Sequence, residues 1–276
     1  MASVDEKGEN TGTGECLFED VLRENFAALA HQTIPRCAER DEDGWRMPGI
    51  VDGHVTAIVH ATLTEMMHAM DLPLPDSSTF PRGGFLQEQD AHMLGAYSFR
   101  ENMIYIHPVF ASVEKYLGAG RGDPLGEELG HYLRSRSLQD NPPPANMLMP
   151  RIEEEFFGYV GRLVLARVAE VRNCTPLLFP HGKVRAPKKK SDVLKALRPL
   201  RNRFFHRHPW LRWLRPFVPI DAKTKKRIDT ITHSRGYQWG ARINVQNIAD
   251  WGKFWSLPFG EARKRFFRED PDYRGL

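Results

Sequence analysis

Residues 126–134 place two acids and a histidine within a few positions of one expected helix. Glu127 and His131 are four residues apart, so at about 100° per residue they share one face, with Glu128 beside them. The leucines of the same stretch form a separate apolar stripe, so the acidic face can point away from the core that anchors the helix. Side chains of these types on one face are suited to holding a metal ion.

The stretch differs by one residue from the motif His-Glu-x-x-His. In that motif two histidines hold zinc, and the glutamate between them takes a proton from metal-bound water. Here Glu127 occupies the position of the first histidine. Glu128 is then the candidate base and His131 a candidate ligand.

A second acidic cluster, residues 153–155, lies near the start of a helix expected over 151–171. Gly158 and Gly161 on that helix would let a neighbouring helix approach closely. Three glutamates at a helix start also suit the positive end of the helix dipole. The cluster therefore has both a metal-binding and a purely structural interpretation.

Hydrophobic periodicity and turn residues predict the remaining elements. They are helices over 17–31 and 55–70, a loop over 72–84, a β-hairpin from 91–98 and 103–107, a helix over 108–116, a motif helix over 124–137 with Asp123 as its N-cap, and helices over 236–248 and 259–267.

Composition indicates a globular protein. The chain has 276 residues, of which 41% are hydrophobic and 11% aromatic. No apolar run approaches the roughly 20 residues of a membrane span, and the polar residues 1–14 carry no signal-peptide pattern, so we expect a disordered tip and a cytoplasmic protein. Cys16, Cys37 and Cys174 are far apart, which favours free thiols.

Residues 181–227 are strongly basic. They contain sixteen Lys or Arg residues against two Asp residues, a net charge of +14, which leaves −10 for the rest of a chain whose total is +4. Aromatic residues interleave with the arginines. This composition fits an anionic partner, whether nucleic acid, a membrane surface or an acidic protein, and it equally fits a solvated basic face.

The order hairpin, short helix, Glu127-Glu128-Leu129-Gly130-His131 helix and Glu155-Phe156-Phe157-Gly158 helix resembles the gluzincin class of zinc metallopeptidases. The resemblance covers roughly residues 90–170. It implies an α+β fold, mainly helical and zincin-like, with a small antiparallel sheet. It also implies zinc as the metal and a peptide or protein as substrate.

Carried over residue by residue, the resemblance makes His131 and Glu155 metal ligands, puts Glu127 at the first ligand position and makes Glu128 the general base. Glu154 is the alternative third ligand. Strand 103–106 would correspond to the cleft strand that pairs with a peptide, and His233 or Tyr237 to the residue that steadies the oxyanion.

Two departures from the family pattern alter what the site is expected to do. Glu127 in place of histidine gives two carboxylates and one imidazole, a set that also suits Mn or Fe and makes bound water less acidic. Tyr159 stands where relatives often carry an acid that orients a ligand histidine. The site could thus serve an unusual hydrolase, or be a retired site that holds no metal in a non-proteolytic descendant.

Two other hypotheses stay open. Glu65-x-x-His68 and Glu128-x-x-His131 share the spacing of ferritin-like di-iron bundles, with Glu24 and either Glu114 or Glu155 as single carboxylates. Alternatively the chain is a binding or scaffold protein that works through its basic segment. Four regions are expected, namely the tip 1–14, a metallopeptidase-like domain 15–180, the basic segment 181–227 and a C-terminal helical subdomain 228–276 packing on the same core.

Overall fold

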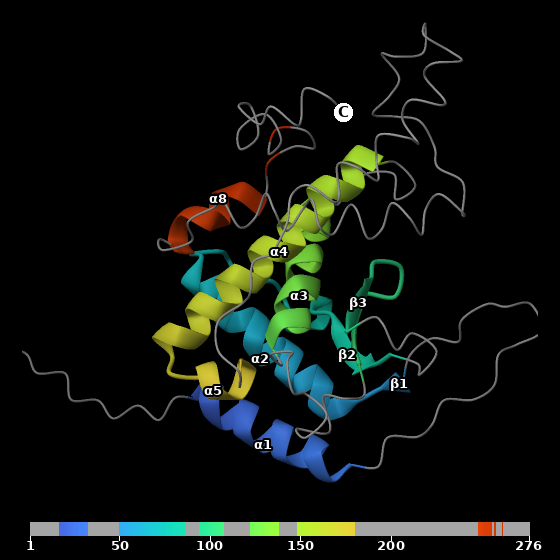
Figure 1. The fold of residues 1–276 in the computed structure, drawn as a ribbon, viewed down its shortest axis with the longest axis vertical. Coiled ribbons are helices and arrows are strands. Elements are labelled where there is room, and N and C mark those ends of the chain that lie inside the picture. The colour runs from blue at the N-terminus through green and yellow to red at the C-terminus, as the bar shows by residue number, and fades with distance from the viewer. Residues whose placement is uncertain are drawn as a thin grey trace, which may run out of the picture.

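Helices make up most of the structure, and a small sheet lies beside them (Figure 1). The structure is a computed structural model and describes residues 17–32, 50–86, 94–107, 122–137, 148–179, 248–255, 257 and 261. The helices are α1 (Leu17–His31), α2 (Gly53–Ala69), α3 (Gly122–Ser137), α4 (Leu148–Val171), α5 (Thr175–Leu178) and α8 (Gly252–Trp255), with 3-10 turns η1 (Ser77–Thr79) and η6 (Ile248–Trp251). The expected α+β class is confirmed.

Helix boundaries follow local capping chemistry. α1 has the predicted limits. α2 begins at Gly53, earlier than predicted, because the Asp52 carboxylate accepts hydrogen bonds from the backbone N–H groups of His54 and Val55. α3 begins at Gly122, so the prediction of Asp123 as its N-cap is wrong: Asp123 lies inside the first turn.

The sheet contains β1 (Ile50–Val51), β2 (Arg82–Phe85), β3 (Gly95–Ser98) and β4 (Met103–Ile106), in the order β1-β2-β4-β3. The predicted hairpin is confirmed by the antiparallel pairing of β3 with β4. The expectation of an antiparallel sheet is wrong, because β2 runs parallel to β4.

The loop prediction over 72–84 is also wrong at its end, where β2 lies. Pro, Ser and Gly in this stretch indicate turns, but Gly83 has a packing role. A Cβ at Gly83 would lie 2.5 Å from the backbone carbonyl carbon of Val55, so the glycine lets β2 approach α2. Long-range packing here overrides local composition.

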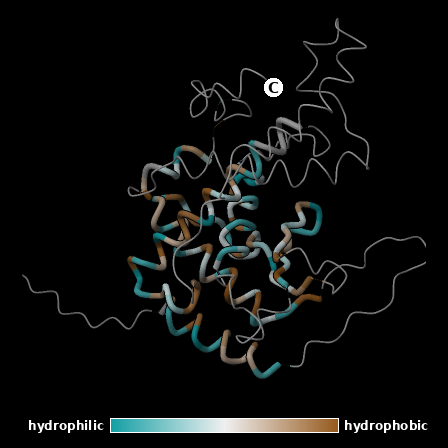
Figure 2. The backbone as a smooth tube through the Cα atoms, in the orientation of Figure 1, coloured by the Kyte–Doolittle hydropathy of each residue, from teal (hydrophilic) through white to brown (hydrophobic). Residues whose placement is uncertain are grey.

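The core is formed by the inward faces of the long helices together with the sheet. Figure 2 shows apolar residues recurring among hydrophilic ones along the helices. Leu22 and Leu29 of α1 and Ile58 and Leu63 of α2 are fully buried in one apolar cluster. The same cluster includes Trp255 of α8. No helix in the described ranges combines the length and the hydropathy needed to cross a bilayer.

α3 and α4 pack closely against each other, and glycines on both helices make this contact possible. A Cβ at Gly161 would lie 2.3 Å from the carbonyl oxygen of Gly126 and 2.7 Å from the Cα of Gly130. A Cβ at Gly130 would lie 2.5 Å from the carbonyl oxygen of Phe157. The backbones therefore touch directly, and the prediction that Gly158 and Gly161 admit a neighbouring helix is confirmed.

This contact predicts a large effect of one methyl group. Gly161→Ala should lower the free energy of unfolding by about 1–3 kcal/mol, because the Cβ meets backbone atoms that cannot turn aside. The matched control is Gly53→Ala, whose Cβ would meet nothing within 4 Å. It should be neutral, or stabilising by up to about 1 kcal/mol. Urea unfolding measures both, and equal stability of Gly161→Ala and wild type would contradict the helix contact.

Candidate metal centre

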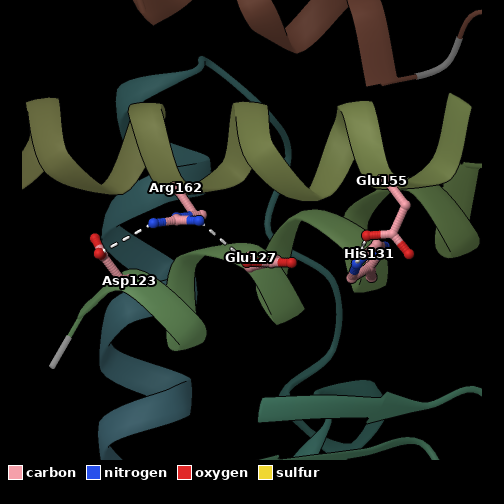
Figure 3. A network of polar contacts seen from close by, with 5 residues as sticks. All are labelled: Asp123, Glu127, His131, Glu155 and Arg162. Atoms are coloured by element: carbon pink, nitrogen blue, oxygen red, sulfur yellow. Dashed lines mark hydrogen bonds and ion pairs between the residues drawn. The ribbon is translucent and has the colours of Figure 1, made fainter. Parts of the chain in front are cut away.

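Glu127, His131 and Glu155 come together where α3 and α4 cross (Figure 3). One ligand atom from each residue lies within 4.8 Å of the other two. The Nε2 atom of His131 is 4.0 Å from Oε2 of Glu155. Two adjacent turns of α3 thus supply two candidate ligands and α4 supplies the third, and these are the three residues that the sequence analysis named.

Gly158 leaves the room that these side chains occupy. A Cβ at Gly158 would lie 2.7 Å from Nε2 of His131 and 3.2 Å from Cγ of Glu127. Any other residue there would push both side chains away from their present positions. The backbone contact and the candidate ligand set therefore depend on the same stretch of α4.

The three donors fit a divalent cation. Glu127 and Glu155 are buried and His131 is mostly buried, so little water competes for the carboxylates. Ligand bonds of about 2.1 Å in a tetrahedral site would put donor atoms about 3.4 Å apart, so the present separations of up to 4.8 Å need to shorten by at most about 1.4 Å. One imidazole and two carboxylates suit zinc, and also Mn or Fe.

Arg162 of α4 joins this cluster to the start of α3, which the sequence analysis missed. Its Nη1 donates to Oε2 of Glu127 over 3.4 Å, and its Nη2 to Oδ2 of Asp123 over 3.0 Å (Figure 3). The guanidinium also lies 5.4 Å from the ring centre of buried Tyr159. Helical spacing in the sequence could have indicated this contact. Asp123 lies one turn before Glu127, and Arg162 lies one turn after Gly158, so all four residues are near the helix crossing.

Burial shapes the titration of groups around Arg162. Desolvation raises the pKa of the Asp123 carboxyl, although the charge and hydrogen bond of Arg162 oppose the rise. Desolvation likewise raises the pKa of the Tyr159 hydroxyl, against the opposing charge of Arg162. Tyr159 thus lies beside the arginine that pairs with Glu127. In the family that the sequence resembles, this position often carries an acid.

Glu128 lies between α3 and the sheet. A Cβ at Gly95 of β3 would be 2.9 Å from its Cγ, and the backbone N–H of Tyr97 donates to its carboxyl group. Burial raises the pKa of Glu128 well above its usual value, and the nearby charges of Glu127 and Glu154 raise it further. Both effects favour the protonated form of this carboxyl group.

Tyr97 of β3 is a second residue beside the candidate site that the sequence analysis missed. Its ring packs edge-on against Tyr132 of α3, with ring centres 5.9 Å apart. Burial raises the pKa of its hydroxyl to about 12, while a hydrogen bond with Ser135 opposes the shift. β3 is thus tied to α3 by both the backbone and the side chain of Tyr97.

The three consecutive glutamates of α4 have three different environments. α4 begins at Leu148, so none of them lies in its first turn and the helix-dipole interpretation is wrong. Glu153 is buried and pairs with Arg134 of α3 over 2.8 Å. The Glu154 side chain is 42% exposed and lies 3.8 Å from Nδ1 of His131, whereas that of Glu155 is 10% exposed and faces Nε2.

The two ring nitrogens of His131 therefore face two different acids. Glu155, and not Glu154, belongs to the group of three that could hold a metal. Ligand histidines usually direct their second ring nitrogen to a carboxylate, which fixes the orientation of the ring. Glu154 lies where such a partner would lie.

Arg134 extends the network from the cluster toward the C-terminal part of the chain. Besides Glu153, its guanidinium donates to the carbonyl oxygens of Trp255 and Leu257 and lies 4.2 Å from the ring centre of Phe157. Burial lowers the pKa of Arg134, and the charge of Glu153 opposes this effect. This buried cation thus holds α3, α4 and α8 together.

The other expected site features have mixed outcomes. The prediction of β4 as the cleft strand is wrong, because β4 pairs with β2 on one edge and β3 on the other and has no edge left for a peptide. Glu65 of the di-iron alternative pairs with Arg172 over 3.0 Å, and in the described ranges it joins no group of three metal-capable residues. His233, Tyr237, the helix over 108–116 and the basic segment 181–227 lie outside the described residues.

The chain matches no protein-family model, and no curated protein or solved structure is significantly similar to it.

The three glutamates offer a matched set of variants for testing these environments. Glu153→Gln should lower the free energy of unfolding by about 3 kcal/mol, because it leaves the buried charge of Arg134 without its carboxylate. Glu154→Gln should change it by less than about 0.5 kcal/mol, because that side chain is 42% exposed and water can solvate it. Chemical denaturation gives both values, and similar losses in the two variants would contradict the assigned roles.

Proposed function

We propose that this chain binds one divalent metal ion through Glu127, His131 and Glu155 and works as a metal-dependent hydrolase with a gluzincin-like site. One observation carries the proposal: two turns of α3 and one of α4 bring one ligand atom of each residue within 4.8 Å of the other two. The steric role of Gly158 beside His131 and Glu127 supports it, because it keeps this space open.

The proposed roles of the residues follow from their positions. Glu127, His131 and Glu155 hold the ion, which when bound would polarise a substrate carbonyl and acidify water. Glu128 accepts a proton from the attacking water on its carboxylate and then gives it to the leaving nitrogen as the peptide bond breaks. Its burial against Gly95 keeps the carboxyl group in one place between α3 and β3.

A peptide substrate would lie along β3. β3 ends the strand order of the described sheet, while β4 already uses both of its edges. An extended peptide can add to such an edge through backbone hydrogen bonds. Because β3 also contacts Glu128, a peptide there would pass close to the proposed base. Zinc is the metal that the family resemblance implies, with Mn and Fe as alternatives.

Metal content tests the ligand assignment directly. Elemental analysis of the wild-type protein should give about one equivalent of zinc, manganese or iron, lost in His131→Ala and in Glu155→Ala because each removes one of three donors. His60→Ala is the matched control and should retain the metal, because His60 does not belong to the group and bonds the carbonyl oxygen of Pro81 instead.

A folded wild-type protein without metal, even after reconstitution with all three ions, would contradict the proposal. Function would then be sought in the basic segment 181–227, whose net charge of +14 fits salt-sensitive binding to a polyanion.

The role of Glu128 has a separate test. Glu128→Gln should keep the metal but lower turnover of a peptide library, followed by mass spectrometry, by about 100-fold or more. The amide keeps the size of the side chain and cannot accept the proton. Unchanged turnover in this variant would reject Glu128 as the base while leaving the metal site in place.

A further inference from the structure

Arg162 contacts one of the three candidate ligands without belonging to the group itself. Its two terminal nitrogens are divided between Glu127 and Asp123, at 3.4 Å and 3.0 Å. Only 11% of its side chain is exposed, and 11% of that of Glu127. The buried guanidinium is therefore held on its far side by Asp123 and reaches Glu127 from outside the cluster.

The Glu127 carboxylate spans the space between Arg162 and His131 (Figure 3). Oε2 accepts the hydrogen bond from Arg162. An oxygen of the same carboxylate lies on the side of His131 and Glu155, within 4.8 Å of their ligand atoms. Arg162 and a cation could thus contact Glu127 at the same time, from opposite sides.

We propose that Arg162 is a positioning residue that enables Glu127 to act as a metal ligand at the position where the motif has a histidine. This inference rests on the proposed function. By binding one oxygen, it directs the carboxylate so that the other faces the cation. By its charge, it offsets the extra negative charge that a glutamate brings in place of a neutral imidazole. Asp123 holds Arg162 in position for both tasks.

Charge in the cluster makes such a partner necessary. Glu127 and Glu155 offer oxygens within 4.8 Å of each other, and Glu128 is also buried beside them. Like charges at this distance repel strongly in a poorly hydrated site. Without Arg162, the Glu127 carboxylate would lower its electrostatic energy by turning away from Glu155. Cation binding would then have to supply the energy to return it to the group.

The opposite hypothesis makes Arg162 a competitor that neutralises Glu127 and keeps a cation out. The contacts favour the positioning role, because the shorter hydrogen bond of Arg162 is to Asp123 and the longer one to Glu127. A cation at the group of three therefore need not displace the arginine. The two hypotheses predict opposite effects of removing it.

The test measures zinc affinity by competition with a chromophoric chelator. Arg162→Met should weaken zinc binding by about 10–100-fold, the usual effect of losing a hydrogen-bond partner of a metal ligand. Asp123→Asn should weaken it less, because the charge of Arg162 remains. Arg167→Met, which breaks a more exposed pair with Glu170 on the same helix, is the control and should leave the affinity unchanged.

A second background makes the test specific to Glu127. In Glu127→His, position 127 offers no carboxylate for Arg162 to hold, and the charge of Arg162 only repels the cation. Adding Arg162→Met there should leave zinc binding unchanged or tighten it, the reverse of its effect in the wild-type background. Circular dichroism checks that each variant is folded.

Three results would overturn the inference. Unchanged or tighter binding in Arg162→Met alone would make Arg162 a competitor, with the metal site intact. Equal weakening in both backgrounds would mean that Arg162 only joins the two helices. If the folded wild-type protein and Glu127→His both fail to bind zinc, the proposed function fails together with the inference.

Discussion

The direct backbone contact between α3 and α4 is the constraint on which the candidate site depends. Glycines at 126, 130, 158 and 161 bring the helix axes close enough for short side chains to meet between them. Glu127 and His131 reach Glu155 only because of this approach. One extra methyl group at the crossing would displace backbone, so the geometry of the ligands is set by the helices rather than by the side chains.

Such a close crossing concentrates charge in a place with little water, and two arginines compensate for it reciprocally. Arg134 extends from α3 to Glu153 on α4, whereas Arg162 extends from α4 to Glu127 and Asp123 on α3. Each buried cation satisfies acids of the opposite helix, so both ion pairs also fix the register of the crossing. The Glu127, His131 and Glu155 group shares Glu127 with the Arg162 ion pair, and neither arginine belongs to the group.

Much of the fold could be predicted because its helices carry clear periodicity and caps. The limits of α1 and the hairpin of β3 and β4 follow from local pattern. β2 could not be predicted, because its Gly83 and its proline-rich approach indicate a loop, and only contact with α2 and parallel pairing with β4 make it a strand. Parallel pairing links segments distant in the chain, which leaves no local signal.

The candidate ligands could be predicted for the same reason as the helices. Spacing alone puts Glu127 and His131 on one face, and the small residue at Gly158 indicates where the next helix touches. The partners of the ligands could not be predicted. Whether Arg162 points to solvent or to Glu127 depends on the angle at which α3 and α4 cross, and no local sequence pattern predicts that angle.

Glu127 stands where the motif His-Glu-x-x-His has its first histidine, and the charge of Glu127 has a different consequence once Arg162 is taken into account. Taken alone, the replacement adds a negative charge, which would make metal-bound water a poorer acid. Arg162 carries one positive charge 3.4 Å from that carboxylate, so the pair as a whole is formally as neutral as the imidazole it replaces. Asp123, the other partner of Arg162, lies outside the group of three. In the proposed metal centre, Arg162 would thus offset the extra negative charge that comes with an oxygen donor in place of a nitrogen.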